Sequence, residues 1–332
     1  YINLHSPYRG LLLYHGLGSG KTCSSIAIAE GIKNSRKIII MTPASLRRNY
    51  IEELKKCGDL LYRKNQYWEW ISVSENPNLI DPLSASLGLP REYIRRNKGA
   101  WLINITKPTN YIDLSSSDKK ILNDQIDEMI KNKYMFINYN SPRLKEDFKQ
   151  LTNNFQDNIF DNAVVIIDEA HNLISRIVNK INKNKSFNLQ KATLSHSISL
   201  ILYDFLLKAD NSRIVLLTGT PMINYPNEIG ILFNILRGYI KTWKFTLSGD
   251  SKLSKDILNQ IFNKEKILDY MDFIPSSKIL TVTRNPYGFE NKITETSGYK
   301  GITNEKKETR DAQGNTIYNE RGQVSNDEFI KR

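Results

Sequence analysis

Short runs of consecutive apolar residues alternate with helical patterns over the first two thirds of the chain. The runs are rich in Ile, Val and Leu and contain no regular polar positions, which is typical of strands covered on both faces. We expect strands at residues 10–14, 37–41, 134–139, 163–167 and 213–217. Helices are expected at residues 22–33, 45–57, 195–208 and 227–236. Strands that alternate with helices imply a parallel sheet with right-handed crossovers, so the pattern predicts a doubly wound α/β fold.

Residues 60–133 interrupt this alternation. The segment contains Trp68, Trp70 and Trp101, several Pro and Gly residues, and a helical stretch at residues 117–131. We interpret it as an elaboration inserted in the α/β domain, with its tryptophans in core packing rather than in base stacking. After residue 238 the alternation stops, and from residue 297 the sequence is polar with turn signals at 313–315 and 321–322. A β-ribbon and a mobile segment fit this tail equally well.

Composition adds charge to this picture. Lys and Arg number 47 against 35 Asp and Glu, a net charge of +12. The excess favours a polyanionic partner, although a solvated surface in a Lys-rich protein fits the charge as well. The first residue is Tyr1 rather than Met, and we interpret the chain as a piece of a longer protein.

Cys23 and Cys57 are the two cysteines of the sequence. Two cysteines predict neither a disulfide framework nor a metal-ligand set, which favours a reducing compartment. No apolar run reaches membrane-spanning length and no signal-peptide pattern occurs, so no membrane partner is expected.

A glycine-rich stretch follows the first predicted strand and runs into the first predicted helix: His15, Gly16, Leu17, Gly18, Ser19, Gly20, Lys21 and Thr22. Glycines allow backbone N–H groups to approach a phosphate chain, and the following helix directs its positive end at the anion. Lys21 would then reach the β- and γ-phosphates of ATP, and Thr22 would bind Mg²⁺. His15 stands where the pattern GxxxxGK[ST] has its first Gly. That position only begins the turn, so the departure weakens the pattern more than the chemistry.

Two further blocks follow later strands. Asp168 and Glu169 come directly after the apolar run 163–167, at the sheet edge where α/β folds bind ligands. Asp168 would hold Mg²⁺ and Glu169 would orient and activate the attacking water. The block Thr218, Gly219 and Thr220 ends the last predicted strand and could bridge His171 to the bound phosphate, while a polar turn is the favoured interpretation of that block by itself.

In this order the blocks resemble the motifs of superfamily 2 helicases and translocases. Residues 16–22 resemble motif I, 41–46 motif Ia, 168–171 motif II and 218–221 motif III, the last in a form nearer to the Swi/Snf branch. The stretches PYRGLLLYHGLGSGKTCSSIAIAEG, VVIIDEAHNL and TRNPYGF are similar to the helicase family of nucleocytoplasmic large DNA viruses. That family includes the poxvirus early transcription factor small subunit and nucleoside triphosphate phosphohydrolase I. Its motif I occurs in the same form, with His in place of the first Gly.

The resemblance implies that residues 1–240 form the first of two RecA-like, P-loop NTPase lobes, with the elaboration at about 60–133 inside it. Residues 241–332 are then a linker and the start of, or an insertion in, an incomplete second lobe, because no Arg-rich motif VI occurs. It implies an ATPase and helicase, a hydrolase that uses ATP and Mg²⁺.

The resemblance also implies that the motif Ia loop contacts nucleic acid, here through Thr42, Pro43 and Arg47, although a solvated helix face fits Arg47 equally well. The implied partners are DNA or RNA, with a viral RNA polymerase or transcription-factor subunit, in the virion and the host-cell cytoplasm. Two alternatives stay open. One is a transcription-factor subunit with DNA-dependent ATPase activity but no strand separation. The other is a non-motor module that only binds nucleotide.

Overall fold

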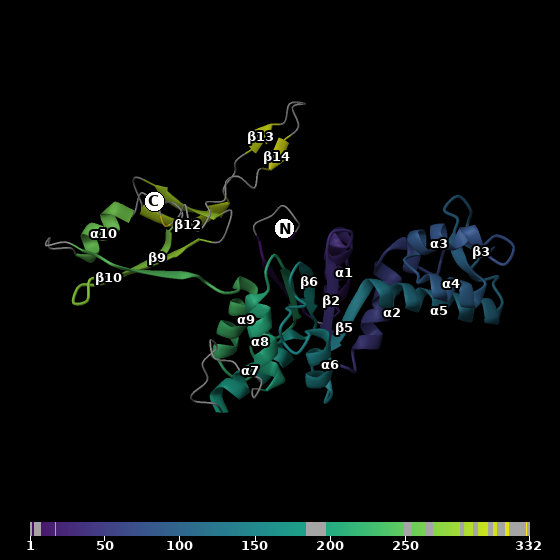
Figure 1. Cartoon of the computed structure of the whole chain (residues 1–332), viewed down its shortest axis with the longest axis horizontal. Coiled ribbons are helices and arrows are strands. Elements are labelled where there is room, and N and C mark those ends of the chain that lie inside the picture. Colours follow the sequence, from purple (N-terminus) through teal and green to yellow (C-terminus); the bar gives the residue numbers. More distant parts are fainter. Residues whose placement is uncertain are drawn as a thin grey trace. The chain divides into compact units, whose positions relative to one another are not determined.

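The computed structural model describes residues 2, 8–16, 18–183, 197–248, 254–262, 268–285, 289–294, 298–304, 308–310, 316–318 and 330. The chain divides into two compact units. One contains Arg9–Gly238 with Ile2, and the other contains Tyr239–Arg332 with residue 1 and Asn3–Tyr8. Figure 1 follows the chain from the purple first strand to the yellow C-terminal ribbons.

The first unit is built on a five-stranded parallel sheet in the order β1–β7–β6–β2–β5. Its strands are β1 (Gly10–Tyr14), β2 (Lys37–Thr42), β5 (Tyr134–Asn138), β6 (Ala163–Ile167) and β7 (Arg213–Thr218). All five predicted strands are confirmed, each end within one residue. The predicted parallel α/β sheet is therefore confirmed as well.

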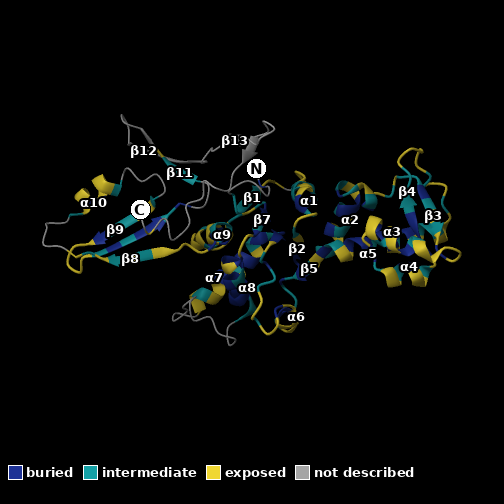
Figure 2. Ribbon diagram, turned by 45° about the horizontal axis from the view of Figure 1, so that its top comes forward, coloured by how far each residue is buried: buried dark blue, intermediate teal, exposed yellow. Residues whose placement is uncertain are grey.

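Helices cover both faces of this sheet, and the strands between them are largely buried (Figure 2). Every residue of β6 is at most 1% exposed, although successive side chains point to opposite faces. On one face the core includes residues of α6 (Leu144–Leu151), α7 (Ala170–Lys183), α8 (Ile198–Lys208) and α9 (Asn227–Arg237). On the other face α1 (Lys21–Ile32) contacts β6 and β7, and α2 (Arg47–Cys57) packs against α1. Burial on both sides explains why the strand sequences show no polar alternation.

The predicted helices are confirmed with shifted ends. The stretch predicted at 22–33 is α1, that at 45–57 is α2, and that at 227–236 is α9. The helix predicted at 195–208 is α8, whose first two predicted residues lie outside the described part of the chain. Among the described residues, no helix combines the length and the apolar character needed to cross a membrane.

The inserted elaboration contains an antiparallel pair of strands, three α-helices and two short 3-10 helices. Its elements are η1 (Leu60–Tyr62), β3 (Trp68–Ser72), η2 (Pro77–Leu79), α3 (Ile80–Leu87), α4 (Arg91–Asn97), β4 (Gly99–Ile103) and α5 (Ser116–Lys133). Helix α5 begins after Ser115, whose side chain accepts a hydrogen bond from the backbone N–H of Asp118. Trp68 and Trp101 are 1% and 7% exposed, which confirms core packing for these two. Trp70 is 39% exposed and lies edge-on to Trp101, with ring centroids 5.4 Å apart.

The second unit is antiparallel. It contains a three-stranded sheet in the order β8–β10–β9, a helix and two two-stranded ribbons. Its elements are β8 (Thr242–Thr246), α10 (Lys255–Phe262), β9 (Leu268–Ile274), β10 (Ile279–Arg284), β11 (Phe289–Thr294), β12 (Gly298–Asn304), β13 (Glu308–Arg310) and β14 (Thr316–Tyr318). The ribbons agree with the β-ribbon interpretation of the tail, although both turn signals and residues 286–288 of the viral-type stretch lie outside the described residues. The assignment of this unit to a second lobe stays a prediction.

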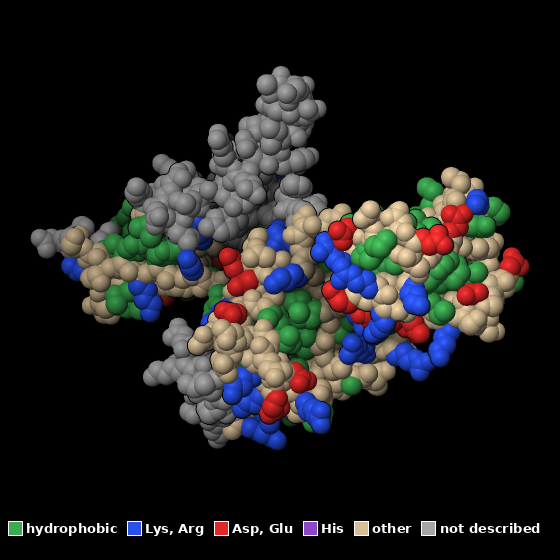
Figure 3. Space-filling view, turned by 45° about the vertical axis from the view of Figure 1, so that its right-hand side comes forward, with side chains coloured by type: hydrophobic (Ala, Val, Ile, Leu, Met, Phe, Trp, Pro, Cys, Tyr) green, Lys and Arg blue, Asp and Glu red, His purple; other side chains and the backbone are tan. Residues whose placement is uncertain are grey.

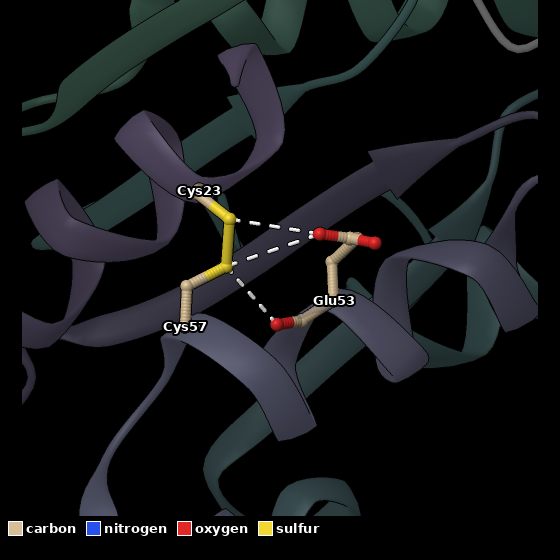
Figure 4. Close-up of side chains that lie close together, drawn as sticks. All are labelled: Cys23, Glu53 and Cys57. Atoms are coloured by element: carbon tan, nitrogen blue, oxygen red, sulfur yellow. Dashed lines mark hydrogen bonds between the residues drawn. A yellow bond between two sulfur atoms is a disulfide. The ribbon is translucent and has the colours of Figure 1, made fainter. Parts of the chain in front are cut away.

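The expectation for the two cysteines is wrong. Cys23, in the first turn of α1, and Cys57, the last residue of α2, form a disulfide (Figure 4). They are 34 positions apart in the sequence and meet only because α2 packs against α1. The inference of a reducing compartment therefore loses its basis.

Candidate functional site

Three loops converge at one edge of the parallel sheet. Strands β1, β7 and β6 are direct neighbours, and Tyr14 at the end of β1 pairs with Thr218 at the end of β7. Because the strands are parallel, the segments that follow them, beginning at His15, Asp168 and Gly219, leave the sheet at the same edge. The fold thus brings together three blocks that lie about 50 to 200 positions apart in the sequence.

The glycine-rich loop has an unusual backbone at two positions. Gly18 and Gly20 have φ of 72° and 78°, a left-handed conformation that side-chain-bearing residues rarely adopt. A Cβ at Gly16, Gly18 or Gly20 would meet no atom within 4 Å, so the space over the loop is open. The Ser19 hydroxyl donates to the Gly16 carbonyl at 2.6 Å and closes the turn. Leu17 lies outside the described residues.

Lys21 and Gly219 both lie against the glycine-rich loop. The Lys21 Nζ donates to the carbonyls of His15 and Gly16, at 2.9 and 3.0 Å. A Cβ at Gly219 would lie 3.3 Å from the His15 carbonyl oxygen and 3.6 Å from Lys21 Nζ. The segment after β7 therefore lies directly against the glycine-rich loop. Thr22, the second residue of α1, is half-buried beside it.

Asp168 is a buried carboxylate at the end of β6. It is 9% exposed, and its backbone N–H donates to the Met41 carbonyl of β2 at 2.9 Å. Burial, and then the charge of Glu169, raises the pKa of Asp168 to about 6. A hydrogen bond from the Glu169 N–H and the charge of Lys21 act in the opposite direction. The carboxylate is thus poorly solvated and faces another negative charge, an arrangement that a bound cation would relieve.

Glu169 has a left-handed backbone, with φ of 47°. Such a conformation in a residue other than Gly costs about 1–3 kcal/mol and persists only where neighbouring contacts hold it. The hydroxyl of Tyr139 lies 2.9 Å from the Asp168 carbonyl and 3.0 Å from the Glu169 carbonyl, to which it donates. Tyr139 is 2% exposed, and burial raises the pKa of its hydroxyl, which keeps it a donor. The sequence reasoning missed this role; its one signal was a tyrosine at the end of an apolar run.

His171 joins the segments after β6 and β7. Its Nδ1 lies 2.8 Å from the Thr218 hydroxyl, 3.4 Å from the Thr220 hydroxyl and 3.4 Å from Glu169 Oε2. The Thr220 N–H donates to the same Thr218 oxygen at 3.0 Å. The predicted block therefore makes a specific contact with His171, and is more than a polar turn. Its contact with a phosphate stays a prediction.

A buried glutamate holds the loop that follows Thr220. Glu228, in the first turn of α9, is 1% exposed, and its Oε2 accepts from the N–H groups of Ile223 and Asn224 at 2.7 and 3.1 Å. Burial alone would raise the pKa of Glu228, but these hydrogen bonds lower it below the usual value. The Asn224 side chain also donates to Ser175 of α7 at 2.7 Å. The sequence reasoning missed Glu228, for which an acidic residue just after Pro226 was the available signal.

Asn140, which follows β5, holds the loop after β2. Thr42 and Pro43, predicted to contact nucleic acid, have buried side chains. The backbone N–H of exposed Ala44 donates to the side-chain oxygen of Asn140 at 2.8 Å. The contact of Thr42 and Pro43 with nucleic acid stays a prediction.

Arg47 begins α2 and is half-buried. Its guanidinium lies 5.1 Å from the centroid of the Phe136 ring, a cation–π distance. The face drawn in Figure 3 mixes Lys and Arg side chains with Asp and Glu side chains. The role of Arg47 in nucleic-acid binding stays a prediction.

The resemblance predicted from the motifs is confirmed by comparison with known proteins. The chain matches the family model "Type III restriction enzyme, res subunit" over residues 3–222. It is 32% identical over 240 residues to "Putative ATP-dependent RNA helicase R563" of Acanthamoeba polyphaga mimivirus, covering 71% of this chain and 30% of that protein. It is 24% identical over 232 residues to "Termination factor NPH-I homolog" of African swine fever virus (isolate Pig/Kenya/KEN-50/1950), covering 70% of this chain and 23% of that protein.

A solved structure, the Sulfolobus solfataricus SWI2/SNF2 ATPase core in complex with dsDNA, aligns with a TM-score of 0.29 and 17% identity over 68% of this chain and 30% of that one. The chain spans less than a third of the length of the two viral relatives described above. Since the family model matches residues 3–222 of 332, the chain belongs to the family described as the type III restriction enzyme, res subunit.

Proposed function

We propose that this chain is the ATP-binding part of a nucleic-acid helicase or translocase of viral type. The whole protein would couple ATP hydrolysis to movement on, or remodelling of, DNA or RNA in viral transcription. The observation that carries the proposal is the convergence of the glycine-rich loop, Asp168–Glu169 and Thr218–Thr220 at one sheet edge, with His171 hydrogen-bonded to Thr218. The relatives' names, which include ATP-dependent helicases and a termination factor, support the same class of activity.

Each polar group at this edge has a distinct proposed role. The backbone N–H groups of the loop cradle the phosphates, and the Lys21 ammonium exchanges its carbonyl partners for the β- and γ-phosphates. Glu169 accepts a proton from the attacking water and orients it. The Tyr139 hydroxyl holds the backbone at Asp168 and Glu169, which keeps both carboxylates in position.

The oxygen atoms at the edge suit Mg²⁺. The proposed ligands are the Thr22 hydroxyl and the Asp168 carboxylate, and Mg²⁺ prefers such hard oxygen donors. Burial raises the pKa of Asp168 to about 6, so a cation would stabilise its ionised form. When bound, Mg²⁺ would neutralise charge on the transferred phosphate.

The contacts of the segment after β7 suggest how nucleotide state reaches the rest of the lobe. Gly219 lies against the His15 carbonyl, Thr218 contacts His171, and Glu228 of α9 holds the loop that follows. A movement of the glycine-rich loop on hydrolysis would therefore displace Gly219. The displacement would reach α9 through the loop that Glu228 holds. This is the proposed coupling element between hydrolysis and movement.

The substrate is DNA or RNA, and the partners of the whole protein are a viral RNA polymerase or a transcription-factor subunit in the virion and the host-cell cytoplasm. A second candidate is a termination-factor-like ATPase that is stimulated by DNA but separates no strands, which the name of the African swine fever virus relative favours. A non-motor nucleotide-binding module is disfavoured because Lys21, Asp168 and Glu169 are all present.

The test is binding and turnover of Mg-ATP, followed by strand displacement. Equilibrium binding of a fluorescent ATP analogue and steady-state ATPase activity, with and without single- or double-stranded DNA and RNA, are measured beside Lys21→Ala. Binding that depends on Lys21, with turnover stimulated by nucleic acid, supports a motor. Strand displacement by the full-length protein separates the helicase from the termination-factor-like ATPase. Equal nucleotide binding by the Lys21→Ala variant would contradict the site.

A further inference from the structure

A second chemical cluster lies on the far side of Thr22 from the glycine-rich loop. Glu53 Oε2 lies 3.6 Å from the sulfur of Cys23 and 4.0 Å from that of Cys57, as Figure 4 shows. Among the described residues, these three side chains are the one group of three or more His, Cys, Asp or Glu residues whose ligand atoms all lie within 4.8 Å of one another. Neither cysteine contributes to the proposed hydrolysis.

The disulfide fixes the base of the glycine-rich loop. Cys23 is the third residue of α1, directly after Thr22, so the bond ties the first turn of α1 to the end of α2. Deeper in the same helix pair, the Ser25 hydroxyl and the Tyr50 hydroxyl share a buried hydrogen bond of 2.8 Å. That hydrogen bond does not involve sulfur, so α1 stays packed against α2 from Ser25 onward when the disulfide is reduced, and only the turn before Ser25 loses its tie. The two thiols then remain within bonding reach of each other.

The surroundings of the sulfurs favour a reversible bond. Glu53 Oε1 is paired with Lys56 at 2.8 Å, while Oε2 faces both sulfurs. In the reduced protein the Cys23 thiol can donate an S–H hydrogen bond to this oxygen, and the Cys57 thiol can donate to it or to the Glu53 backbone carbonyl, 3.2 Å from its sulfur. Disulfide sulfurs have no proton and present lone pairs to these oxygens. Glu53 therefore stabilises the reduced pair relative to the oxidised one. Both cysteines are half-buried and accessible to a small thiol reagent.

We propose that Cys23–Cys57 is a reversible redox site that controls the order of the glycine-rich loop. The oxidant is a small-molecule disulfide such as glutathione disulfide. One cysteine sulfur attacks it, forming a mixed disulfide and releasing one glutathione; the other cysteine then attacks the mixed disulfide and releases the second. The protein loses two electrons and two protons, which appear in two glutathione thiols. The oxidised form holds the first turn of α1, and with it the loop, against α2; reduction frees that turn.

The test compares oxidised and reduced protein in three measurements. Intact mass reports loss of two hydrogens rather than a glutathione adduct. Hydrogen exchange should slow about three- to tenfold in the oxidised form at peptides covering residues 16–25. Closing a loop between positions 34 apart should also raise Tm by roughly 5–10 °C. In glutathione redox buffers, Glu53→Gln should shift the equilibrium about three- to tenfold towards the disulfide, whereas the control Glu52→Gln should not.

Cys23→Ser and Cys57→Ser should each stop at the mixed disulfide, visible by intact mass as one glutathione adduct, because the second attack is lost. Neither variant should show the slowed hydrogen exchange at residues 16–25 that the intramolecular bond produces. Failure of the bond to form, or its formation with unchanged exchange at residues 16–25, would overturn the inference. So would tight binding of one Zn²⁺ by the reduced protein that depends on both cysteines and Glu53 and blocks oxidation, since the cluster would then be a metal site. Only the phosphate-binding role of the glycine-rich loop rests on the proposed function; the redox site does not. Protein that forms the bond and orders the loop, yet binds no nucleotide in either state, would support this inference and contradict that function.

Discussion

The buried carboxylate of Asp168 should make the protein less stable, and its removal should make it more stable. Burial and the neighbouring Glu169 charge place the pKa of Asp168 at about 6, against 3.8 for an ordinary Asp. At about 1.36 kcal/mol for each pKa unit, ionising this group costs the folded protein up to about 3 kcal/mol at neutral pH when no cation is bound. Asp168→Asn removes the charge and keeps an oxygen that accepts from the Glu169 N–H.

The sign of the pH dependence follows from the raised pKa. Below about pH 4 the carboxyl is protonated in the folded and the unfolded chain, so variant and wild type differ little. Between about pH 4 and 6 the unfolded chain ionises first, and the wild type loses stability relative to Asp168→Asn. Above about pH 6 the difference reaches its full value of up to about 3 kcal/mol and stays constant. The same variant should lose Mg²⁺-dependent nucleotide binding.

Urea unfolding at a series of pH values, with EDTA present, measures the difference in unfolding free energy. Asp157→Asn is the matched control, because Asp157 is exposed and should show no such pH-dependent gain. In a separate series without EDTA, adding Mg-ADP should stabilise the wild type and leave Asp168→Asn unchanged. An Asp168→Asn variant that is less stable than wild type at pH 7, or a difference that does not vary between pH 4 and 6, would refute the reasoning.

Four other substitutions test the site. In the full-length protein, Lys21→Ala should abolish ATP turnover without changing Tm, because its Nζ contacts loop carbonyls rather than the core. Steady-state ATPase activity and thermal melts measure this, and retained activity would contradict it. Glu169→Gln should bind Mg-ATP within a few-fold of wild type but turn it over about 10²–10⁴ times more slowly. If the variant lost nucleotide affinity as much as turnover, Glu169 would instead contact the phosphates or the metal. Tyr139→Phe should lose about 1–2 kcal/mol of stability and lower turnover more than nucleotide affinity, since a buried donor to two carbonyls is removed. Gly219→Ala places a Cβ 3.3 Å from the His15 carbonyl and should raise the Kd for nucleotide about tenfold; unchanged affinity would mean that the loop yields freely.

The local features of the sequence were sufficient for the five strands of the parallel sheet and for α1, α2, α5, α8 and α9, but they did not reveal α6 or α7. A strand buried on both faces has no polar positions, so it stands out as a continuous apolar run. The five runs therefore located β1, β2, β5, β6 and β7 to within one residue. The left-handed backbone at Gly18 and Gly20 and the polar residues directly after β6 and β7 are also local, and adjacent sequence is enough to suggest them. The roles of Lys21, Thr22, Asp168 and Glu169 remain predictions, which the substitutions above are designed to test.

The contacts that join these blocks depend on tertiary structure. The apolar runs are alike in composition, so nothing in them specifies that β7 lies between β1 and β6, yet that order is what brings Thr218 to His171 and Gly219 to the glycine-rich loop. The same holds for Tyr139, whose hydroxyl reaches backbone about 30 positions away.

The sequence by itself determined the strands of the parallel sheet, part of the flanking helices and the glycine-rich loop, because side-chain periodicity and backbone preference act between neighbouring residues. It did not determine the Cys23–Cys57 bond, which arises from the packing of α2 against α1 across 34 positions. Nor did it determine the burial of Asp168, on which the pKa of about 6 depends. Both follow from strand order and helix packing, which are decided by the burial of the whole core rather than by any single segment.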